Sequence, residues 1–288
     1  MQAQPPFNAN VDTDAGTAHP THGSALATVT RYHGGKASAA AETDDIAVEA
    51  PIALQYNGIS HATLLATPLN LEELALGFSL TEGILRSAAD LHDIEIHETS
   101  QGHVLEITIA SACFVELKQR RRTLAGRTGC GLCGLESLDD VVRPLPRVSG
   151  PAEPLDSRAV LKALSALRTR QPLHQRTGAT HAAGWADLSG ELLHVREDVG
   201  RHNALDKLIG RLMQRRDAHD TSAGFAVISS RASFEMVQKA AAVNIPAVIA
   251  VSAPTHYAMQ TAERLGVMLI GFARGDDFTV YAHPQHLG

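Results

Sequence analysis

Residues 44–117 alternate short apolar runs with turn-forming residues, and this pattern predicts a small α+β unit. The dipeptide Asn57-Gly58 separates two apolar runs, which is a strong signal for a β-hairpin. The segment 70–85 follows with apolar residues at helical spacing, and Asn70 is its expected N-cap. A second pair of strands is predicted over 93–110, where the alternation returns.

The second half of the chain alternates amphipathic segments with continuous apolar segments. The runs GFAVISS and PAVIAVS are continuously apolar up to their terminal serines, which is typical of strands that are buried on both faces. The expected helices cover 157–170, 201–213, 233–244 and 255–266, and the expected strands cover 181–198 (a pair), 224–230, 246–252 and 267–283 (a pair that turns at 274–277). Helices that alternate with buried strands predict a layered α/β sheet.

These patterns divide the chain into three parts. Residues 1–43 are rich in small and polar side chains, which bury too little surface to offset the entropy of ordering, so we expect a disordered N-terminal extension. The small α+β domain then covers 44–150 and ends in a glycine-flanked cysteine loop and a proline-rich linker at 143–154. The layered α/β domain covers 151–288.

Composition narrows the class of protein. The 288 residues carry a net charge of −6, which argues against a general nucleic-acid-binding protein. Only three cysteines occur, two of them in a Cys-x-x-Cys pair, so no disulfide framework is expected and a reducing cytoplasm fits better. No apolar run approaches the ~20 residues that cross a bilayer, and the N-terminus lacks the pattern of a secretory signal. We therefore expect a cytoplasmic protein with neither membrane nor nucleic acid as a partner.

Polar residues collect at three predicted strand-to-helix junctions, at 196–203, 229–233 and 252–256. Ligands of open α/β sheets bind outside the carboxyl ends of the strands, beside helix N-termini that favour anions. The candidate binding residues are Glu197, Asp198, Arg201, His202, Ser229, Ser230, Arg231 and Thr255. Arginines, hydroxyls and carboxylates together suit a phosphorylated heterocycle. The alternative for each residue alone, that it caps a helix or lies on the surface, stays open.

The stretch GRTGCGLCGLESL at 126–138 places Cys130 and Cys133 three positions apart among glycines. A protein core does not explain this arrangement, because glycine offers nothing to pack and costs backbone entropy. A reactive thiolate explains it best, since a nearby arginine such as Arg127 lowers the pKa of a cysteine below its free value of ~8.5. The glycines would then leave the sulfur accessible to a bulky partner.

Three other interpretations of the pair stay open. A structural zinc ion needs two further ligands, and Cys113 lies in the apolar stretch ASACFVEL, where a core position is expected. A thioredoxin-like redox pair is expected between a strand and a helix of a βαβ pattern, whereas this pair follows an arginine-rich segment. An inert loop is the third possibility, although free structural cysteines are usually buried.

Four motifs, GRTGCGLCG, EDVGRHNALDKLIG, SSRASFEMVQKAA and VSAPTHYAMQTA, resemble the FdhD family of formate dehydrogenase accessory sulfurtransferases. The resemblance covers nearly everything after residue 44. It implies a sulfur carrier that passes persulfide sulfur from a cysteine desulfurase to the molybdenum cofactor of formate dehydrogenase. It also implies that Cys130 carries the persulfide and that Cys133 is its companion thiol. Two rival functions are a cofactor-binding insertion chaperone that transfers no sulfur and a thiol-disulfide oxidoreductase.

The resemblance further implies a bound cargo, the bis(molybdopterin guanine dinucleotide) form of the cofactor, with no tightly held metal of the protein's own. The segment at the matching place near the C-terminus consists of Phe272, Ala273, Arg274, Gly275, Asp276 and Asp277. This segment is also a good hairpin turn by its own chemistry. A homodimer is suggested by the resemblance alone.

The family's second half resembles the cytidine deaminase fold, so we expect 151–288 to be a cytidine-deaminase-like α/β domain. Zinc deaminases carry His-x-Glu and, later, Pro-Cys-x-x-Cys. Here His181 is followed by two alanines and no proline precedes Cys130, so deamination is not expected.

Overall fold

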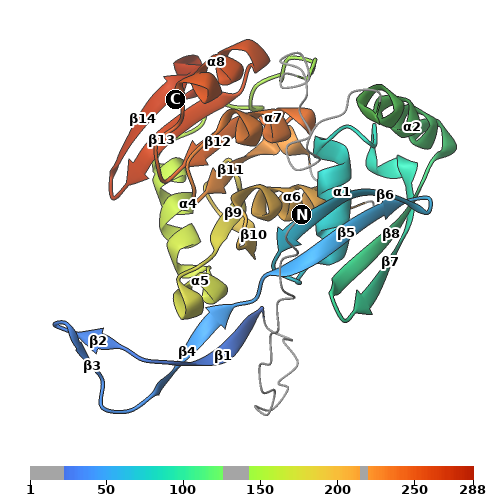
Figure 1. Cartoon of the computed structure of the whole chain (residues 1–288). Helices are drawn as coiled ribbons and strands as arrows, with labels where there is room; N and C mark the ends of the chain where they lie inside the picture. The colour runs from blue at the N-terminus through green and yellow to red at the C-terminus, as the bar shows by residue number, and fades with distance from the viewer. Residues whose placement is uncertain (1–22, 126–142, 215–219) are drawn as a thin grey trace, which may run out of the picture.

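The structure is a computed structural model that describes residues 23–125, 143–214 and 220–288. Its fold is mixed α/β, with an N-terminal α+β unit followed by a layered α/β unit, as the sequence predicts (Figure 1). In the described part of the chain, no helix is both long and apolar enough to cross a membrane.

The N-terminal unit is a four-stranded sheet in the order β6-β5-β8-β7, with helix α1 packed on one face. Its elements are β5 (Ala50–Tyr56), β6 (Ile59–Ala66), α1 (Leu71–Thr81), a short 3-10 helix (Ala88–Asp90), β7 (Leu91–Thr99), β8 (Gly102–Ile109) and α2 (Ser111–Ala125). The hairpin at Asn57-Gly58 is confirmed, and both residues have the positive φ (46° and 78°) that a tight two-residue turn requires. The core between sheet and helix includes Leu54, Leu74 and Leu105.

The start of α1 differs from the prediction in one respect. Asn70 occupies the N-cap position, but its backbone is left-handed (φ 54°) and its side chain makes no capping hydrogen bond. Asn tolerates this backbone region better than most residues do. Asn70 therefore contributes the left-handed backbone conformation of the turn that leads into the helix, and not a side-chain cap.

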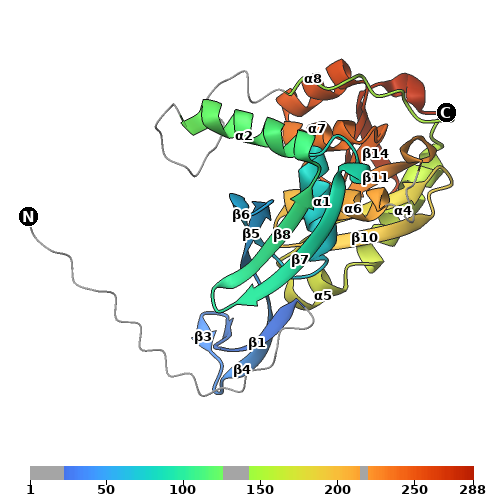
Figure 2. The ribbon, with the colours of Figure 1, turned by 90° about the vertical axis from the view of Figure 1, so that its right-hand side faces the viewer.

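An arm of two short antiparallel strand pairs precedes the N-terminal unit and corrects the prediction for part of the first 43 residues. Residues 24–47 form β1 (Ser24–Val29), β2 (Tyr32–His33), β3 (Lys36–Ala37) and β4 (Glu42–Ala47). Strand β1 pairs with β4, which continues almost directly into β5, so the arm extends the sheet outward (Figures 1 and 2). Arg31 forms ion pairs with Glu42 (3.1 Å) and Asp44 (3.0 Å) across the arm. The expectation of disorder was thus wrong for residues 23–43, because cross-strand pairing adds order that composition does not reveal.

The C-terminal unit is a six-stranded sheet in the order β10-β9-β11-β12-β13-β14. Its elements are α4 (Ser157–Thr169), α5 (Pro172–Thr177), β9 (His181–Asp187), β10 (Leu192–Asp198), α6 (Arg201–Met213), β11 (Gly224–Ile228), α7 (Phe234–Ala242), β12 (Ala247–Ala250), α8 (His256–Leu265), β13 (Met268–Arg274) and β14 (Asp277–Ala282), with short 3-10 helices at Thr221–Ala223 and Pro284–His286. Helices α6, α7 and α8 pack on one face and α4 packs on the other. The predicted helices and strands of this half are confirmed, whereas the short helix α5 was not foreseen.

The proline-rich segment that follows residue 142 lies against the C-terminal unit. The amide of Val148 donates to the carbonyl of Leu265 (2.7 Å), and Leu155 forms a parallel bridge with Leu287 near the C-terminus. Both Val148 and Leu155 are buried. The linker therefore already packs on the C-terminal unit at Val148, before residue 150. The position of a domain boundary at residue 150 stays a prediction.

Helices α1 and α6 join the two units at a very close crossing. A Cβ atom placed on Gly77 of α1 would lie 1.8 Å from the carbonyl oxygen of Asp206, and one placed on Gly210 of α6 would lie 1.9 Å from that of Glu73. Only glycine at both positions lets the two backbones approach this closely. The crossing fixes α1 against the sheet-covering helices α6 and α7, and the cavity described below lies among these three helices.

Candidate functional site

The cysteine pair lies outside the described residues, so the structure gives no geometry for Cys130, Cys133 or Arg127. The chain is described up to the end of α2 at Ala125 and again from Arg143, which lines a cavity beside α1. The third cysteine, Cys113, is fully buried in the core of the N-terminal unit, as the sequence predicts.

The three polar junctions lie along one edge of the six-stranded sheet. Strand β9 lies between β10 and β11 and is antiparallel to both, so β10 and β11 run in the same direction. Strands β11, β12 and β13 are parallel to one another. The four strands β10, β11, β12 and β13 therefore all end at the same edge of the sheet. The amide of Thr255 donates to the carbonyl of Ala232 (3.0 Å), and that of Phe272 donates to Ser252 (3.2 Å). The second junction, the third junction and the hairpin at 272–277 are therefore neighbours. Four strand spacings of ~4.8 Å separate β10 from β13, so the edge is ~19 Å long.

Asp198 faces the interior and joins the two units. Its side chain is completely buried, lies 2.6 Å from Nζ of the equally buried Lys207, and accepts hydrogen bonds from the amides of Thr67 (3.1 Å) and Gly200 (2.8 Å). Burial lowers the pKa of Lys207, and the charge of Asp198 opposes this shift. Lys207 also donates to the carbonyl of Thr67 (2.8 Å). The bonds of Asp198 are thus used to hold the N-terminal unit against α6.

Several other predicted site residues have local structural roles. Ser229 Oγ accepts from the amide of Ala182 (2.9 Å), and Ser230 Oγ donates to the carbonyl of Arg231 (3.1 Å). Thr255 caps α8 through the amide of Ala258 (3.2 Å). Glu197 accepts from the amides of Leu173 and His174 (3.0 and 2.7 Å) at the start of α5. Arg231 is exposed at the same edge.

Donors without partners remain at the starts of α6 and α7. Arg201 Nε and Ser233 Oγ are buried atoms that have no hydrogen-bond partner among the described residues. Burial and the neighbouring Arg201 both lower the pKa of His181, which begins the adjacent strand β9. Free backbone N–H groups at helix N-termini add partial positive charge to this region. The edge can therefore attract an anion at Arg201.

Segment 272–277 forms the hairpin between β13 and β14, as its turn chemistry predicts. Phe272 has a positive φ (52°) and an exposed ring, and Arg274 pairs with Asp277 across the turn. Gly275 is open, because a Cβ there would meet no atom within 4 Å. The guanidinium Nε of Arg274 lies 3.5 Å from the carbonyl of Val251, which keeps the side chain at the same edge as the junctions.

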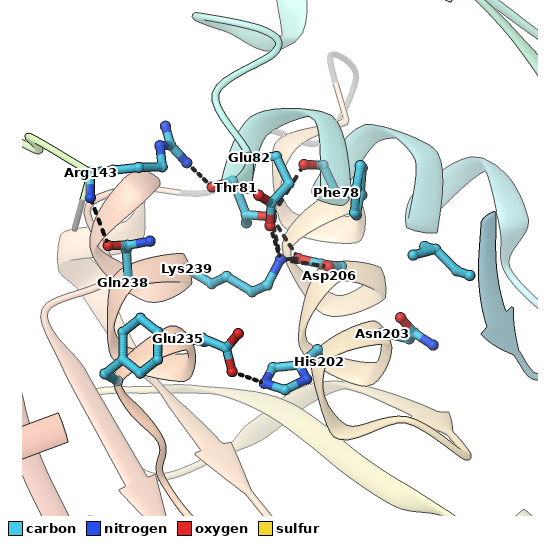
Figure 3. Close-up of a pocket in the computed structure, with 12 residues that line it drawn as sticks. Phe78, Thr81, Glu82, Arg143, His202, Asn203, Asp206, Glu235, Gln238 and Lys239 are labelled. Carbon is cyan, nitrogen blue, oxygen red and sulfur yellow. Dashed lines mark hydrogen bonds and ion pairs between the residues drawn. The ribbon is translucent and has the colours of Figure 1, made fainter. Parts of the chain in front are cut away.

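A cavity of about 290 Å³ lies among α1, α6 and α7, next to the strand-end edge (Figure 3). Of the predicted site residues, His202 alone is among the described residues that line it. Its other lining side chains include Phe78 from α1, Phe234 and Gln238 from α7, and Arg143. The sequence motifs contained most of these residues, but their separate positions gave no sign that they share a cavity.

A buried ionic cluster closes one end of the cavity. Lys239 Nζ contacts Asp206 Oδ2 (2.9 Å), Glu82 Oε1 (2.8 Å) and Thr81 Oγ1 (3.0 Å), and Thr81 also donates to Asp206 (2.7 Å). Burial disfavours the charged form of Lys239, but Asp206 and Glu82 outweigh this and raise its pKa. Burial also disfavours ionisation of Glu82, but Lys239 outweighs it and lowers the pKa of Glu82. Because these residues come from α6, α7 and the C-terminal end of α1, the cluster fixes the three walls relative to one another.

A second polar contact lies toward the other end of the cavity. His202 Nε2 of α6 is 2.9 Å from Glu235 Oε2 of α7 (Figure 3). The hydrogen bond from His202 lowers the pKa of Glu235, against the opposing effect of burial. Glu235 is therefore an ionised acceptor at neutral pH, and it lies one helical turn from Gln238.

The protein is thus a two-unit α/β protein with a polar cavity between helices of both units. The chain belongs to the FdhD/NarQ family, whose family model matches residues 47–288. It is 54% identical to the sulfur carrier protein FdhD of Bordetella bronchiseptica, over 90% of this chain and 93% of the relative. It is 52% identical to the sulfur carrier protein FdhD of Variovorax paradoxus, over 85% of this chain and 87% of the relative.

A solved structure has the same fold. It is the crystal structure of a proposed formate dehydrogenase accessory protein from Desulfotalea psychrophila, and it matches with a TM-score of 0.73 at 20% sequence identity. The match covers 92% of this chain and 99% of that chain.

Proposed function

We propose that this protein is a cytoplasmic sulfur carrier that serves formate dehydrogenase and holds its sulfur as a persulfide on Cys130. The observation that carries the proposal is the glycine-flanked Cys-x-x-Cys motif in a chain of the FdhD/NarQ family, whose relatives are named sulfur carrier proteins. The burial of Cys113 supports it, because a sealed thiol cannot meet a donor protein and the motif cysteines are the remaining thiols.

The loading step is a thiol exchange. The thiolate of Cys130 attacks the outer sulfur of a persulfide on a cysteine desulfurase, the sulfur–sulfur bond of the donor breaks, and the donor cysteine leaves as a thiolate. The outer sulfur, with its proton, is then bonded to Cys130. In the release step, the thiolate of Cys133 attacks Cys130, which forms a disulfide and frees hydrosulfide. A dithiol reductant then returns the pair to its reduced state.

The sulfur acceptor is the cargo of this carrier, the bis(molybdopterin guanine dinucleotide) form of the molybdenum cofactor. Its phosphates would contact the strand-end edge, where Arg201 and Ser233 have donor atoms without described partners and two helices begin. Exposed Arg231 and the hairpin at 272–277 supply further donors along the same edge. The length of this edge suits an extended dinucleotide.

Transfer of labelled sulfur tests the proposal. The protein is incubated with a cysteine desulfurase and ³⁵S-cysteine, and the label bound to protein is measured on non-reducing gels. Wild-type protein and the matched control Cys113→Ala should retain label, whereas Cys130→Ala should lose it. Cys133→Ala should load normally and release its sulfur more slowly.

Label that persists on Cys130→Ala would contradict the assignment of the carrier cysteine. Full activation of formate dehydrogenase by a protein lacking both motif cysteines would favour the insertion chaperone instead.

A further inference from the structure

Helices α4 and α5 carry an uneven distribution of charge. Between Asp156, the N-cap of α4, and Asp187, the last residue of β9, the chain contains five arginines or lysines and no aspartate or glutamate, although the whole protein has a net charge of −6. The five cationic residues are Arg158, Lys162, Arg168, Arg170 and Arg176, and all five are exposed. These five residues make up the basic face of the protein.

The packing of α4 directs its cations toward solvent. Four of its side chains are buried in the core of the C-terminal unit, namely Val160, Ala163, Leu164 and Leu167. This apolar stripe occupies one side of the helix, as in other amphipathic helices. Arg158, Lys162 and Arg168 therefore lie on the solvent side. The basic face is a consequence of how α4 packs on the sheet.

The carboxylates beside the basic face are already engaged within the protein. Glu191 forms an exposed ion pair with Lys162 (3.1 Å). Glu197 accepts hydrogen bonds from two backbone amides of α5 (3.0 and 2.7 Å). By contrast, Arg168 and Arg170 form no ion pair with any carboxylate of the described residues. Their positive charge is thus available to an external partner.

A cavity of about 530 Å³ adjoins the basic face and is lined by residues of α5 and β10. Arg170 and Arg176 line it, together with the apolar side chains of Leu69, Pro172 and Leu173. Arg170 donates to two backbone carbonyls of β10, which orient its guanidinium group without neutralising its charge. Such a cavity suits an apolar side chain that is flanked by carboxylates.

We propose that the basic face and this cavity dock an acidic segment of the enzyme that accepts the sulfur. Four of the five cations are arginines, whose planar guanidinium groups bind carboxylates in a bidentate geometry. Complementary charge speeds the encounter of the two proteins, and an apolar side chain in the cavity holds the complex together. The inference rests on the proposed function in one respect, because it requires an acceptor protein.

The position of the basic face favours the acceptor over the sulfur donor. Strand β10 lines the cavity as far as Glu197 and ends one residue later, at the sheet edge where the phosphates of the cargo are proposed to lie. A protein that docks on the basic face therefore adjoins the cargo. Helix α2, after which the chain continues to Cys130, lies away from α4 and α5 in both views (Figures 1 and 2). A donor protein at that end of the molecule leaves the basic face free.

Activation of formate dehydrogenase at increasing concentrations of the sulfur-loaded, full-length protein tests this inference. Wild type is compared with Arg168→Glu/Arg176→Glu, which reverses two charges of the basic face. The concentration that gives half-maximal activation should rise about tenfold or more, because like charges then oppose each other across the interface. The maximal activation and the rate of ³⁵S loading onto Cys130 should stay those of wild type.

Two controls separate docking from a general effect of charge. Lys36→Glu/Arg264→Glu, at exposed sites on β3 and α8, changes the net charge by the same amount and should behave like wild type. High salt should reduce the difference between wild type and Arg168→Glu/Arg176→Glu, because it screens the exposed charges. If the charge reversal unfolds the protein, Arg168→Gln/Arg176→Gln should give a smaller rise in the same direction.

Competition identifies the chemistry of the partner. An acidic peptide with leucine at its centre should inhibit activation more strongly than the same peptide with serine there, because the leucine buries apolar surface in the cavity. Stronger inhibition by an RNA oligonucleotide of equal charge than by either peptide would show a nucleic-acid site and overturn the inference.

The remaining outcomes also decide the matter, once thermal melting shows that the variants are folded. An unchanged half-maximal concentration in Arg168→Glu/Arg176→Glu, or an equal rise in the control, overturns the inference. Slower ³⁵S loading of the variant would assign the basic face to the donor and overturns it as well. Wild type that loads no sulfur contradicts the proposed function instead, so the two failures are distinguishable.

Discussion

Lys239 and Asp206 form a buried ion pair, with Nζ 2.9 Å from Oδ2, where α7 meets α6 beneath the end of α1. Both side chains are almost inaccessible to solvent, at 9% and 1% exposure. Thr81, the last residue of α1, and Glu82, which follows it, complete the cluster. Through its contacts with Thr81 and Glu82, the pair therefore links the two units of the protein at the wall of the candidate cavity.

Removal of one partner of this pair should destabilise the protein strongly. Lys239→Met leaves Asp206 buried without its counter-ion, which costs roughly 3–5 kcal/mol in comparable cases. The double variant Lys239→Met/Asp206→Leu should cost clearly less than the sum of the two single changes, because neither charge then remains unpaired. Urea unfolding measures all three free energies. Additive effects of the two substitutions would contradict the proposed coupling.

The glycine crossing of α1 and α6 should tolerate no added methyl group. In Gly77→Ala the new Cβ would collide with backbone of α6, so we expect a loss in unfolding free energy well above ~2 kcal/mol, or failure to fold. Gly178→Ala is the matched control, because a Cβ there meets nothing within 4 Å. Its cost should be the ~1–2 kcal/mol of a left-handed backbone alone. Thermal melting compares the two, and a smaller effect at Gly77 would contradict the described contact.

Substitution of Asp198 should affect folding more than ligand binding. Asp198→Asn removes the charge that compensates buried Lys207, and we expect a loss of roughly 3–5 kcal/mol in stability. Asp198→Asn protein that remains folded at low temperature should bind GDP with a dissociation constant within about twofold of that of wild type. This change is much smaller than the tenfold that corresponds to about 1.4 kcal/mol of binding free energy. Chemical unfolding and calorimetry measure the two quantities. Normal stability with lost binding would instead show that Asp198 contacts the ligand.

Glu82 should make the stability of the protein depend on pH. Lys239 lowers the pKa of Glu82 in the folded protein below its usual value near 4.5. The folded state then holds fewer protons, so the contribution of Glu82 is present above pH 4.5 and is lost as the pH falls through the lower folded pKa. Wild type should lose stability more steeply than Glu82→Gln in this range. Parallel profiles of unfolding free energy against pH would contradict the pKa shift, and Glu116→Gln serves as the exposed control.

Local patterns were sufficient to predict most elements of the fold. Asn57-Gly58 marked its hairpin because only a few residues adopt two successive left-handed conformations. The arm at residues 23–47 was missed because its order comes from pairing between β1 and β4, which single-strand composition does not show. Helix α5 was missed because six residues give too little periodicity to recognise.

The site was predictable only in part. Alternation of strands and helices placed the polar junctions at one edge, since the direction of each strand follows from this order. The inward position of Asp198 could not be predicted, because its partner Thr67 is 131 residues away in the sequence. The cavity formed by Glu235, Gln238 and Lys239 required the packing of α7 against a helix of the other unit.

Mass spectrometry of the loaded protein tests the central claim, the carrier role of Cys130, most directly. Trypsin cleaves after Arg127 and next after Arg147, because Pro144 blocks cleavage at Arg143, so one peptide contains both motif cysteines and excludes Cys113. After incubation with a cysteine desulfurase and cysteine, this peptide should be one sulfur atom heavier, and its fragments should place that sulfur on Cys130. Extra sulfur on Cys133 or Cys113, or none on any cysteine, would contradict the account.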